Sequence, residues 1–269
     1  MNMGVGDMNT TNPVALVTGA SSGIGEAFAH ALAARGDDLV VVARDHARLE
    51  QLAESLEKEH GIEVEVLAAD LTSKKGTAVV EARLESAEPA IDLLVNNAGY
   101  GTYGKFADLP REPEVREVRL NVLAVMQLTH AALPGMVERG RGGIINVSSL
   151  AGYQPTPLNA TYGGTKAFVT SFSHALHEEL RGTGVNVMVL CPGFTRTEFQ
   201  ERAGLDSSAV PSFMWQSADA VVAAALRSYK HGRAACIPGP LNQAGAVFSS
   251  AMPGGITRRL AGAILNRVE

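Results

Sequence analysis

Short apolar runs alternate with longer segments of mixed polarity along most of this chain. Seven runs predict strands, and several of them are nearly continuous in Val, Ile and Leu, as expected for strands buried on both faces of a parallel sheet. The seven runs are residues 14–18, 38–43, 62–68, 91–95, 143–148, 185–190 and 234–238. The segments between them predict helices over residues 23–35, 45–59, 73–87, 112–139, 160–181 and 217–230. Gly36, Gly61 and Gly182 follow three of these segments, where helices commonly end.

This alternation predicts an α/β fold. We expect a single-domain, doubly wound Rossmann fold with about seven parallel strands and helices on both faces. No stretch between residues 14 and 239 has the composition of a linker. The expected organisation is a disordered N-terminus (1–12), a Rossmann-fold catalytic domain (13–240) and a C-terminal helical extension (241–269). That extension would cover a substrate cleft or a subunit interface.

Composition narrows the class of protein. Of the 269 residues, 46% are hydrophobic and 19% are charged, which is typical of a globular chain. The net charge is −5 without a dense Lys/Arg cluster, so we expect no nucleic-acid partner. The first residues lack the basic and apolar regions of a signal peptide, and no run approaches the roughly 20 apolar residues of a membrane span. A cytoplasmic protein without a transmembrane segment is expected.

Cysteine and histidine positions do not predict a metal site. Cys191 and Cys236 each lie in an apolar run, which favours two buried thiols. His174 and His177 are three residues apart on a predicted helix, without a third ligand nearby in the sequence.

A glycine-rich segment, "TGASSGIG" at residues 18–25, directly follows the first predicted strand and opens the first helix. Gly19, Gly23 and Gly25 permit a tight turn and close packing of that helix on the sheet. The helix N-terminus then presents N–H groups to an anion such as a pyrophosphate. The pattern favours a dinucleotide site, and a glycine-rich turn without a ligand is the alternative.

The end of the second predicted strand, "VVVARD", bears on the choice of dinucleotide. An acidic residue at this point would bind a ribose 2′-hydroxyl, whereas a basic one suits a 2′-phosphate. Arg44 lies here, and its guanidinium can hold a phosphate through two hydrogen bonds. NADP(H) is therefore the expected cofactor, with NAD(H) possible. The alternatives are a solvated loop cation for Arg44 and a first-turn helix acid for Asp45.

Tyr162 and Lys166, in "NATYGGTKAFV" at residues 159–169, are four positions apart. Four residues are about one helical turn, so both side chains would share a helix face. This spacing alone does not distinguish a catalytic pair from two neighbours.

The ordered set of motifs resembles the short-chain dehydrogenase/reductase family over nearly all of residues 14–239. The motifs are "TGASSGIG", Asp70 in "AADL", "NNAG" at 96–99, Asn121, "SS" at 148–149, Tyr162-x-x-x-Lys166 and "PG" at 192–193. The resemblance implies an NAD(P)-dependent enzyme that interconverts a carbonyl and an alcohol by hydride transfer. It implies catalytic roles for Asn121, Ser149, Tyr162 and Lys166.

The same resemblance implies a set of cofactor contacts. Arg44 would reach the 2′-phosphate, Asp70 and Leu71 the adenine, and Tyr162 and Lys166 the nicotinamide side. The glycine loop would contribute Gly19, Ser21, Ser22, Gly23, Ile24 and Gly25. The ends of the fourth and sixth strands would contribute Asn97, Ala98, Gly99, Pro192, Gly193, Thr195 and Thr197.

The chemistry explains why these residue types are needed. Hydride addition to a carbonyl makes an alkoxide, which must receive a proton, and Tyr162 is the expected general acid/base. A phenol with a pKa of about 10 cycles poorly near neutral pH. Lys166 and the oxidised nicotinamide are expected to lower the pKa of Tyr162. Ser149 would steady the substrate oxygen, and Asn121 would hold a water that connects Lys166 to solvent.

Aromatic residues near these motifs leave the substrate open. Residues 193–216 include Phe194, Phe199, Phe213, Met214 and Trp215, and residues 100–106 include Tyr100, Tyr103 and Phe106. They favour either an apolar lid for a lipophilic ketone or aldehyde, or ordinary loop packing. The enzymatic alternative is a 3-oxoacyl-ACP/CoA reductase. A non-catalytic dinucleotide sensor is a third hypothesis, against which the intact Ser149, Tyr162 and Lys166 argue.

Two further features accompany the resemblance. Ile256, Leu260 and Ile264 recur at helical spacing, which favours a covering helix or a subunit contact over a membrane-surface helix. The resemblance also implies a homodimer or homotetramer formed through the helices at 112–139 and 160–181. Gly163 and Gly164 depart from the common family pattern, and the sequence offers no reason for them.

Overall fold

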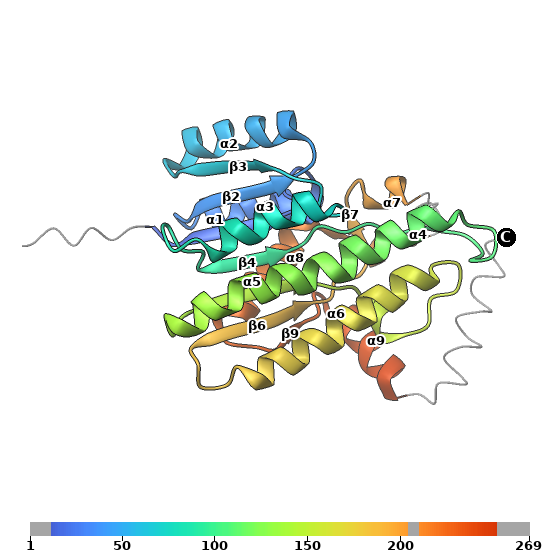
Figure 1. Cartoon of the computed structure of the whole chain (residues 1–269). Coiled ribbons are helices and arrows are strands. Elements are labelled where there is room, and N and C mark those ends of the chain that lie inside the picture. The colour runs from blue at the N-terminus through green and yellow to red at the C-terminus, as the bar shows by residue number, and fades with distance from the viewer. Residues whose placement is uncertain (1–11, 204–209, 252–269) are drawn as a thin grey trace, which may run out of the picture.

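Seven parallel strands form one sheet in the computed structural model, which describes residues 12–203 and 210–251 (Figure 1). Their order is β3-β2-β1-β4-β5-β6-β9, and every pairing between them is parallel. The strands are β1 (Val14–Thr18), β2 (Asp38–Ala43), β3 (Val64–Ala68), β4 (Leu93–Asn96), β5 (Gly142–Val147), β6 (Val185–Leu190) and β9 (Ala235–Cys236). Each overlaps a predicted run, with β4 and β5 extending one residue beyond theirs, so the doubly wound parallel sheet is confirmed.

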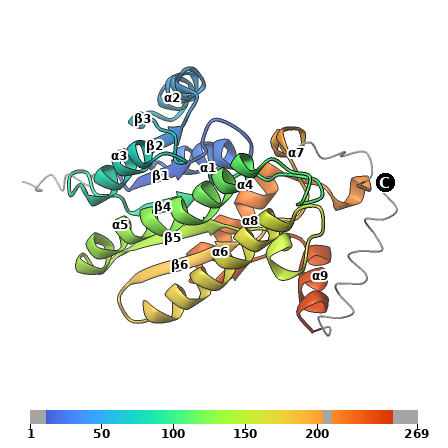
Figure 2. The same cartoon turned by 45° about the vertical axis from the view of Figure 1, so that its right-hand side comes forward.

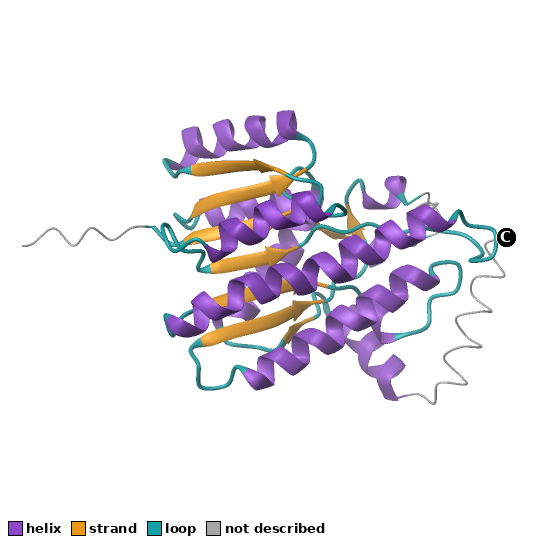
Figure 3. Cartoon of the chain, in the orientation of Figure 1, coloured by secondary structure: helices purple, strands orange, loops and turns teal. Residues whose placement is uncertain are grey.

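Helices cover both faces of this sheet (Figure 3). One face carries α1 (Gly23–Ala33), α2 (His46–His60) and α8 (Ala218–Lys230). The other carries α3 (Lys74–Glu85), α5 (Val125–Glu138) and α6 (Ala160–Glu179). A π-helical turn, η1 (Arg119–Ala124), joins α4 (Arg111–Val118) to α5 in one continuous helix. All six predicted helices are therefore present.

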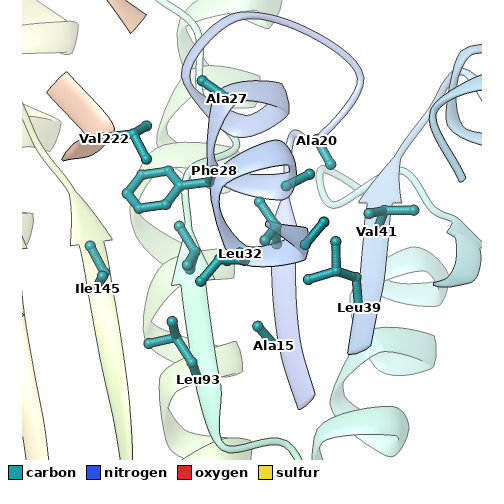
Figure 4. Close-up of a cluster of buried hydrophobic side chains, with 14 of the residues drawn as sticks. Ala15, Ala20, Ala27, Phe28, Leu32, Leu39, Val41, Leu93, Ile145 and Val222 are labelled. Atoms are coloured by element: carbon teal, nitrogen blue, oxygen red, sulfur yellow. The ribbon is translucent and has the colours of Figure 1, made fainter. Parts of the chain in front are cut away.

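The core consists of two apolar layers, one on each face. Successive strand residues point to opposite faces, so Ala15 and Val17 of β1 pack towards α1 while Val14 and Leu16 pack towards α3 and α5. Phe28 of α1 is fully buried over the strands (Figure 4). Full burial of such a side chain contributes about 1.5–3 kcal/mol. Burial on both faces explains why the runs of β1, β2 and β4 are almost continuously apolar, whereas the edge strand β3 is more exposed and contains Glu65.

The helix Arg111–Glu138 is long and apolar enough, by length and composition alone, to cross a membrane. Its most apolar window has a mean hydropathy of 1.3, and 44% of that window is buried inside the protein. A core helix of a soluble protein passes the same test, so this is weak evidence. The expected lack of a transmembrane segment stays a prediction, as do the cytoplasmic location and the homo-oligomer.

The chain after β6 has more structure than the sequence predicted. A two-residue strand β7 (Thr195–Arg196) pairs in parallel with β8 (Gln216–Ser217). Between them lie α7 (Phe199–Arg202) and a 3₁₀ turn, η4 (Ser212–Met214), and α9 (Pro240–Ala251) follows β9 (Figure 2). The predicted helical positions Ile256, Leu260 and Ile264 lie outside the described residues, as does most of the predicted disordered N-terminus.

The two cysteines are buried free thiols, as predicted. His177 is tied to the sheet, because its Nδ1 lies 2.9 Å from the carbonyl oxygen of Val187. Across residues 12–203 and 210–251, no three His, Cys, Asp or Glu side chains gather as a metal site would require.

The two glycines that the sequence left unexplained have different surroundings. A Cβ atom on Gly163 would lie 2.0 Å from Oγ1 of Thr156, in the segment that leads into α6. Gly164 is exposed, and a Cβ atom there would meet nothing within 4 Å. Close packing therefore requires Gly163, whereas no contact requires Gly164.

We predict that Gly164→Ala stabilises the protein by up to about 1 kcal/mol, the difference between alanine and glycine in a helix interior. Gly163→Ala, one position away, should destabilise it. Thr156 would have to turn away from the new methyl group and lose its 3.0 Å hydrogen bond to Asn159 O. Urea unfolding of the two variants measures both effects. A loss of stability in Gly164→Ala, or equal midpoints for the two variants, would contradict this account.

Candidate active site

The predicted site residues gather at the carboxyl ends of β1, β4, β5 and β6. The strand order reverses between β1 and β4, so the connections that leave these two strands diverge. In open parallel sheets, ligands bind outside the carboxyl ends of the strands at such a reversal. This edge faces right in Figure 1, where α7 and the start of α4 lie beyond the strand ends.

Thr18, the last residue of β1, joins the two diverging strand ends. Its Oγ1 donates to Val95 O at 3.2 Å and accepts from the backbone N–H groups of Asn97 and Ala98, at 2.9 and 3.0 Å. The Asn97 side chain donates back to Thr18 O at 2.9 Å and Gly19 O at 3.3 Å. Asn97 and Ala98 therefore hold the glycine loop against β4. Sequence reasoning missed Thr18 because its partners are nearly 80 residues away.

The glycine loop is too compact for larger residues. Gly19 and Gly23 have φ values of +66° and +60°, in the left-handed region that favours glycine. A Cβ atom on Gly25 would lie 2.1 Å from Gly19 O. Ser22 is the N-cap residue of α1, and its side chain makes no cap hydrogen bond. The N–H groups of the first helical turn are therefore available to bind an anion. Ile24 is half-buried and packs against the apolar core.

This loop fits the phosphates of a dinucleotide, and residues 192–197 face it. A Cβ atom on Gly23 would lie 2.9 Å from Cγ2 of Thr197, so the Thr197 side chain borders the loop directly. Thr195 Oγ1 donates to Gly193 O at 3.1 Å, and Pro192 O accepts from Leu150 N at 3.0 Å. The Thr197 side chain from the segment after β6 therefore borders the glycine loop after β1. Ser21, also predicted, is half-buried in the same loop.

Arg44 follows β2 and is exposed. No hydrogen bond or ion pair joins its side chain to another residue of the described ranges. The neighbouring Asp45 is the N-cap of α2, where its side chain accepts from Arg48 N at 3.1 Å. Asp45 was considered as an acid in the first turn of this helix. It lies one position earlier, at the N-cap, where it has a structural role.

Asp70 lies beyond the end of β3 and is held as a carboxylate. Burial alone would raise its pKa, but hydrogen bonds from the Thr72 backbone and hydroxyl, with the charges of Arg44 and Arg116, lower it overall. Leu71 is 6% exposed and packs in the core. Of this predicted pair, only Asp70 presents a polar side chain to a cofactor.

The structure brings Ser149, Tyr162 and Lys166 together as the family resemblance implies. Tyr162 and Lys166 lie one turn apart on α6, with Lys166 Nζ 5.6 Å from the centroid of the Tyr162 ring. Ser149 hydrogen-bonds the side chain of Tyr162, and its Oγ also accepts from Ala151 N at 3.1 Å. Lys166 Nζ donates to Val147 O at 2.8 Å, at the end of β5.

The pKa of Tyr162 does not follow the expected direction. Burial raises it to about 12, the hydrogen bond with Ser149 opposes this rise, and the charges of Glu117 and Cys191 add to it. Burial lowers the pKa of Lys166 to about 8, and Glu117 and Cys191 oppose that shift. The prediction that Lys166 lowers the pKa of Tyr162 is therefore wrong for the polypeptide alone. The cost of burying the phenolate outweighs any attraction from an ammonium that is directed at Val147 O.

Asn121 lies in the π-helical turn η1, and its side chain is fully buried. Its Oδ1 accepts from Tyr100 N at 3.2 Å, and its Nδ2 donates to Tyr100 O at 2.8 Å and Thr165 Oγ1 at 3.1 Å. π-helical turns are uncommon and frequently mark functional sites. Asn121 thus clamps the loop after β4 to α6. A water held by Asn121 stays a prediction.

Apolar side chains surround the phenol of Tyr162. The Phe199 ring centroid is 5.5 Å from that of Tyr162, and a Cβ atom on Gly101 would lie 3.0 Å from Tyr162 Cδ2. Phe194 and Trp215 form a second aromatic pair, at 5.6 Å. Three more of the predicted lid and loop side chains are exposed: Phe106, Phe213 and Met214. An apolar molecule could therefore meet aromatic side chains beside the phenol.

Glu117 is a buried acid that sequence reasoning missed. It lies one helical turn before Asn121, and its side chain is fully buried. Its Oε2 accepts from Thr102 N at 3.0 Å and Thr102 Oγ1 at 2.9 Å. Burial raises its pKa to about 7. The four-residue spacing to Asn121 in "EVRLN" was the available signal, but nothing local distinguishes this glutamate from a solvated helix residue.

Comparisons with known proteins agree with this geometry. The family model described as short chain dehydrogenase matches residues 13–207. The very-long-chain 3-oxoacyl-CoA reductase of Anas platyrhynchos is 37% identical over 192 residues, which cover 70% of this chain and 61% of the relative. The chain thus spans less than two thirds of that relative's length.

Two solved structures are similar over most of their length. A short-chain dehydrogenase from Sphingobium yanoikuyae in complex with NADPH is 39% identical with a TM-score of 0.81, over 90% of this chain and 96% of that one. The bulky-bulky ketone specific alcohol dehydrogenase from Comamonas testosteroni is 35% identical with a TM-score of 0.77, over the same shares of the two chains. With the Ser149, Tyr162 and Lys166 cluster and the glycine loop at one sheet edge, these matches show that the chain belongs to the short-chain dehydrogenase/reductase family.

Proposed function

We propose that this protein is an NADP(H)-dependent oxidoreductase that interconverts an apolar ketone or aldehyde and its alcohol by hydride transfer. The observation that carries the proposal is the meeting of Ser149, Tyr162 and Lys166 beside the glycine loop. Ser149 follows β5, and Tyr162 and Lys166 lie one turn apart on α6. All three are needed for proton transfer to a carbonyl oxygen. The hydride itself is supplied by the nicotinamide when bound.

Tyr162 is the proton donor in this proposal. Its raised pKa of about 12 keeps the hydroxyl protonated throughout the physiological range. A protonated phenol suits the reductive direction, in which an alkoxide oxygen must receive a proton. The Ser149 hydroxyl, which already hydrogen-bonds Tyr162, would hold the carbonyl oxygen at the same point. The aromatic contact with Phe199 places an apolar ring beside the phenol.

Lys166 supplies positive charge close to the phenol. Its ammonium is anchored on Val147 O, so its position is fixed before any ligand binds. A fixed charge needs little reorganisation when negative charge develops on the phenol oxygen. The family resemblance also assigns Lys166 a contact with the nicotinamide ribose.

Arg44 supports the choice of NADP(H). It follows β2, where the ribose of a dinucleotide lies in this kind of fold, and its guanidinium has no partner in the described part of the chain. The NADPH complex of the similar Sphingobium protein is consistent with this choice. NAD(H) remains the alternative cofactor.

A 3-oxoacyl-CoA or 3-oxoacyl-ACP reductase is the second candidate, favoured by the similarity to a very-long-chain 3-oxoacyl-CoA reductase. The reacting group is again a ketone, so the same three side chains would serve. An NADPH-oxidation assay over bulky ketones, aldehydes and 3-oxoacyl thioesters distinguishes the two candidates by kcat/KM. Tight cofactor binding without turnover of any compound would instead support a non-catalytic sensor.

We predict that Tyr162→Phe lowers kcat for carbonyl reduction by about 10²- to 10⁴-fold, the usual contribution of a general acid. The substitution removes one hydroxyl group and leaves the ring contact with Phe199 in place. NADPH affinity, measured by fluorescence titration, should change little and serves as the control for folding. Wild-type turnover by this variant would show that another group donates the proton.

We predict that Arg44→Ala weakens NADPH binding by about 10-fold or more, the loss expected for charge-assisted hydrogen bonds, while NADH binding changes much less. Titration of both cofactors measures the difference. Arg48→Ala is the matched control, because Arg48 is a nearby cation whose guanidinium is already paired with Glu198 at 3.2 Å. A wild-type preference for NADH, or equal losses for both cofactors, would remove Arg44 from the 2′-phosphate site.

A further inference from the structure

Two carboxyl groups lie buried on the face of α4 that meets α6. Glu117 is fully buried and Glu114 is 7% exposed. Oε2 of Glu114 accepts from the hydroxyl of Thr161, the residue before Tyr162. In each glutamate the second oxygen, Oε1, is buried without a hydrogen-bond partner among the described residues. An unpaired buried carboxylate oxygen is costly, so these two acids call for an explanation beyond packing.

Glu117 holds the loop that borders Tyr162. Its carboxyl group accepts both the N–H and the hydroxyl of Thr102. The carbonyl oxygen of Thr102 in turn accepts from the side chain of Asn159, the N-cap residue of α6. Gly101, next to Thr102, lies directly against the Tyr162 ring. A chain of hydrogen bonds therefore runs from Glu117 to the start of the helix that carries Tyr162.

Glu117 also acts electrostatically on the reacting side chains. Its negative charge raises the pKa of Lys166 and the pKa of Tyr162, and Lys166 in return lowers the pKa of Glu117. The other titratable groups around it are Glu114 on its own helix, Tyr100 on the loop after β4, and Cys191 after β6, which acts on both Tyr162 and Lys166. The geometry also places the Lys166 ammonium near this part of the helix. A Cβ atom on Gly99 would lie 3.5 Å from Lys166 Nζ and 3.0 Å from Oδ1 of Asn121, which lies one turn after Glu117.

We propose that Glu117 is a positioning residue for the carbonyl-reducing site, whose negative charge keeps Lys166 protonated and Tyr162 un-ionised, and so sets the upper pH limit of proton donation. The inference rests on the proposed function. As the pH rises through neutrality, the Glu117 carboxyl loses its proton and becomes the counter-ion that Lys166 requires. Below neutrality the carboxyl is neutral, and Lys166 keeps its proton without help. Glu117 thereby extends the range over which the Tyr–Lys pair is ready to reduce a carbonyl.

The test is the pH dependence of Glu117→Gln. The glutamine Oε1 can still accept from Thr102, so this variant removes the charge and keeps the loop contact. Both the descending alkaline limb of carbonyl reduction and the ascending limb of alcohol oxidation should move to lower pH, by about one unit. Reduction then falls and oxidation rises at mildly alkaline pH, while below about pH 6 the profiles of variant and wild type converge.

Two further variants separate charge from structure. Glu117→Asp keeps the charge and should keep the wild-type pH limits, even where its shorter side chain lowers kcat. Glu112→Gln removes an equal charge from the exposed side of the same helix, where Glu112 lies 3.6 Å from Arg119, and should leave the profile unchanged. If Glu117→Gln only scales the rate equally at every pH, or if Glu117→Asp shifts the profile as Glu117→Gln does, the proposal is overturned.

A second measurement needs neither substrate nor cofactor. NMR of protein labelled with ¹³C at the lysine ε-carbon follows the titration of Lys166, whose signal is assigned by its loss in Lys166→Met. Lys166 should titrate about one pH unit lower in Glu117→Gln than in wild type. An unchanged titration overturns the role of Glu117. If instead this shift is seen but the wild type reduces no carbonyl compound, the charge coupling holds and the proposed function fails.

Discussion

The parallel pairing of β1 with β4 is the constraint on which the candidate site depends. Paired residues of these two strands are 78 positions apart in sequence, as at Val17 and Val95. Their connections leave in opposite directions, because β2 and β3 continue on one side and β5, β6 and β9 on the other. The side chain of Thr18 then binds the two ends together through Val95, Asn97 and Ala98. Most of the predicted cofactor residues lie on the connections that leave these two strands or a neighbouring strand end, and Tyr162 and Lys166 lie on α6.

Local patterns predicted most of the fold because a strand that is buried on both faces is a continuous apolar run, which can be recognised without knowledge of the neighbouring strands. The Tyr162–Lys166 pair was equally accessible, since one helical turn fixes their common face. What the sequence could not predict depends on distant contacts. The role of Thr18 needs β4 beside it, the requirement for Gly163 needs Thr156 packed against α6, and the strand β7 is only two residues long and exists because Gln216 and Ser217 pair with it.

In the polypeptide alone, the pKa of Tyr162 shifts in the direction opposite to the one predicted for the Tyr–Lys pair with a bound nicotinamide. A lysine one turn from a tyrosine suggests a lowered phenol pKa if the attraction between ammonium and phenolate is the largest effect. Within this fold both groups are desolvated, and desolvation disfavours phenolate and ammonium alike. The pKa of Tyr162 therefore rises and that of Lys166 falls. The two shifts leave a neutral phenol beside an ammonium that loses its proton more readily than an exposed lysine does.

An ammonium group whose pKa is lowered in this way stays protonated at alkaline pH only if a nearby group stabilises its charge. Val147 O contributes a hydrogen bond but no net charge. Glu117, fully buried one turn from Asn121, contributes the opposite charge and raises the pKa of Lys166. A buried carboxyl group costs folding free energy, part of which its two hydrogen bonds from Thr102 offset. An apolar residue at the position of Glu117 would pack at lower cost. A carboxyl group buried beside the reacting side chains is therefore expected of a residue whose charge has a function.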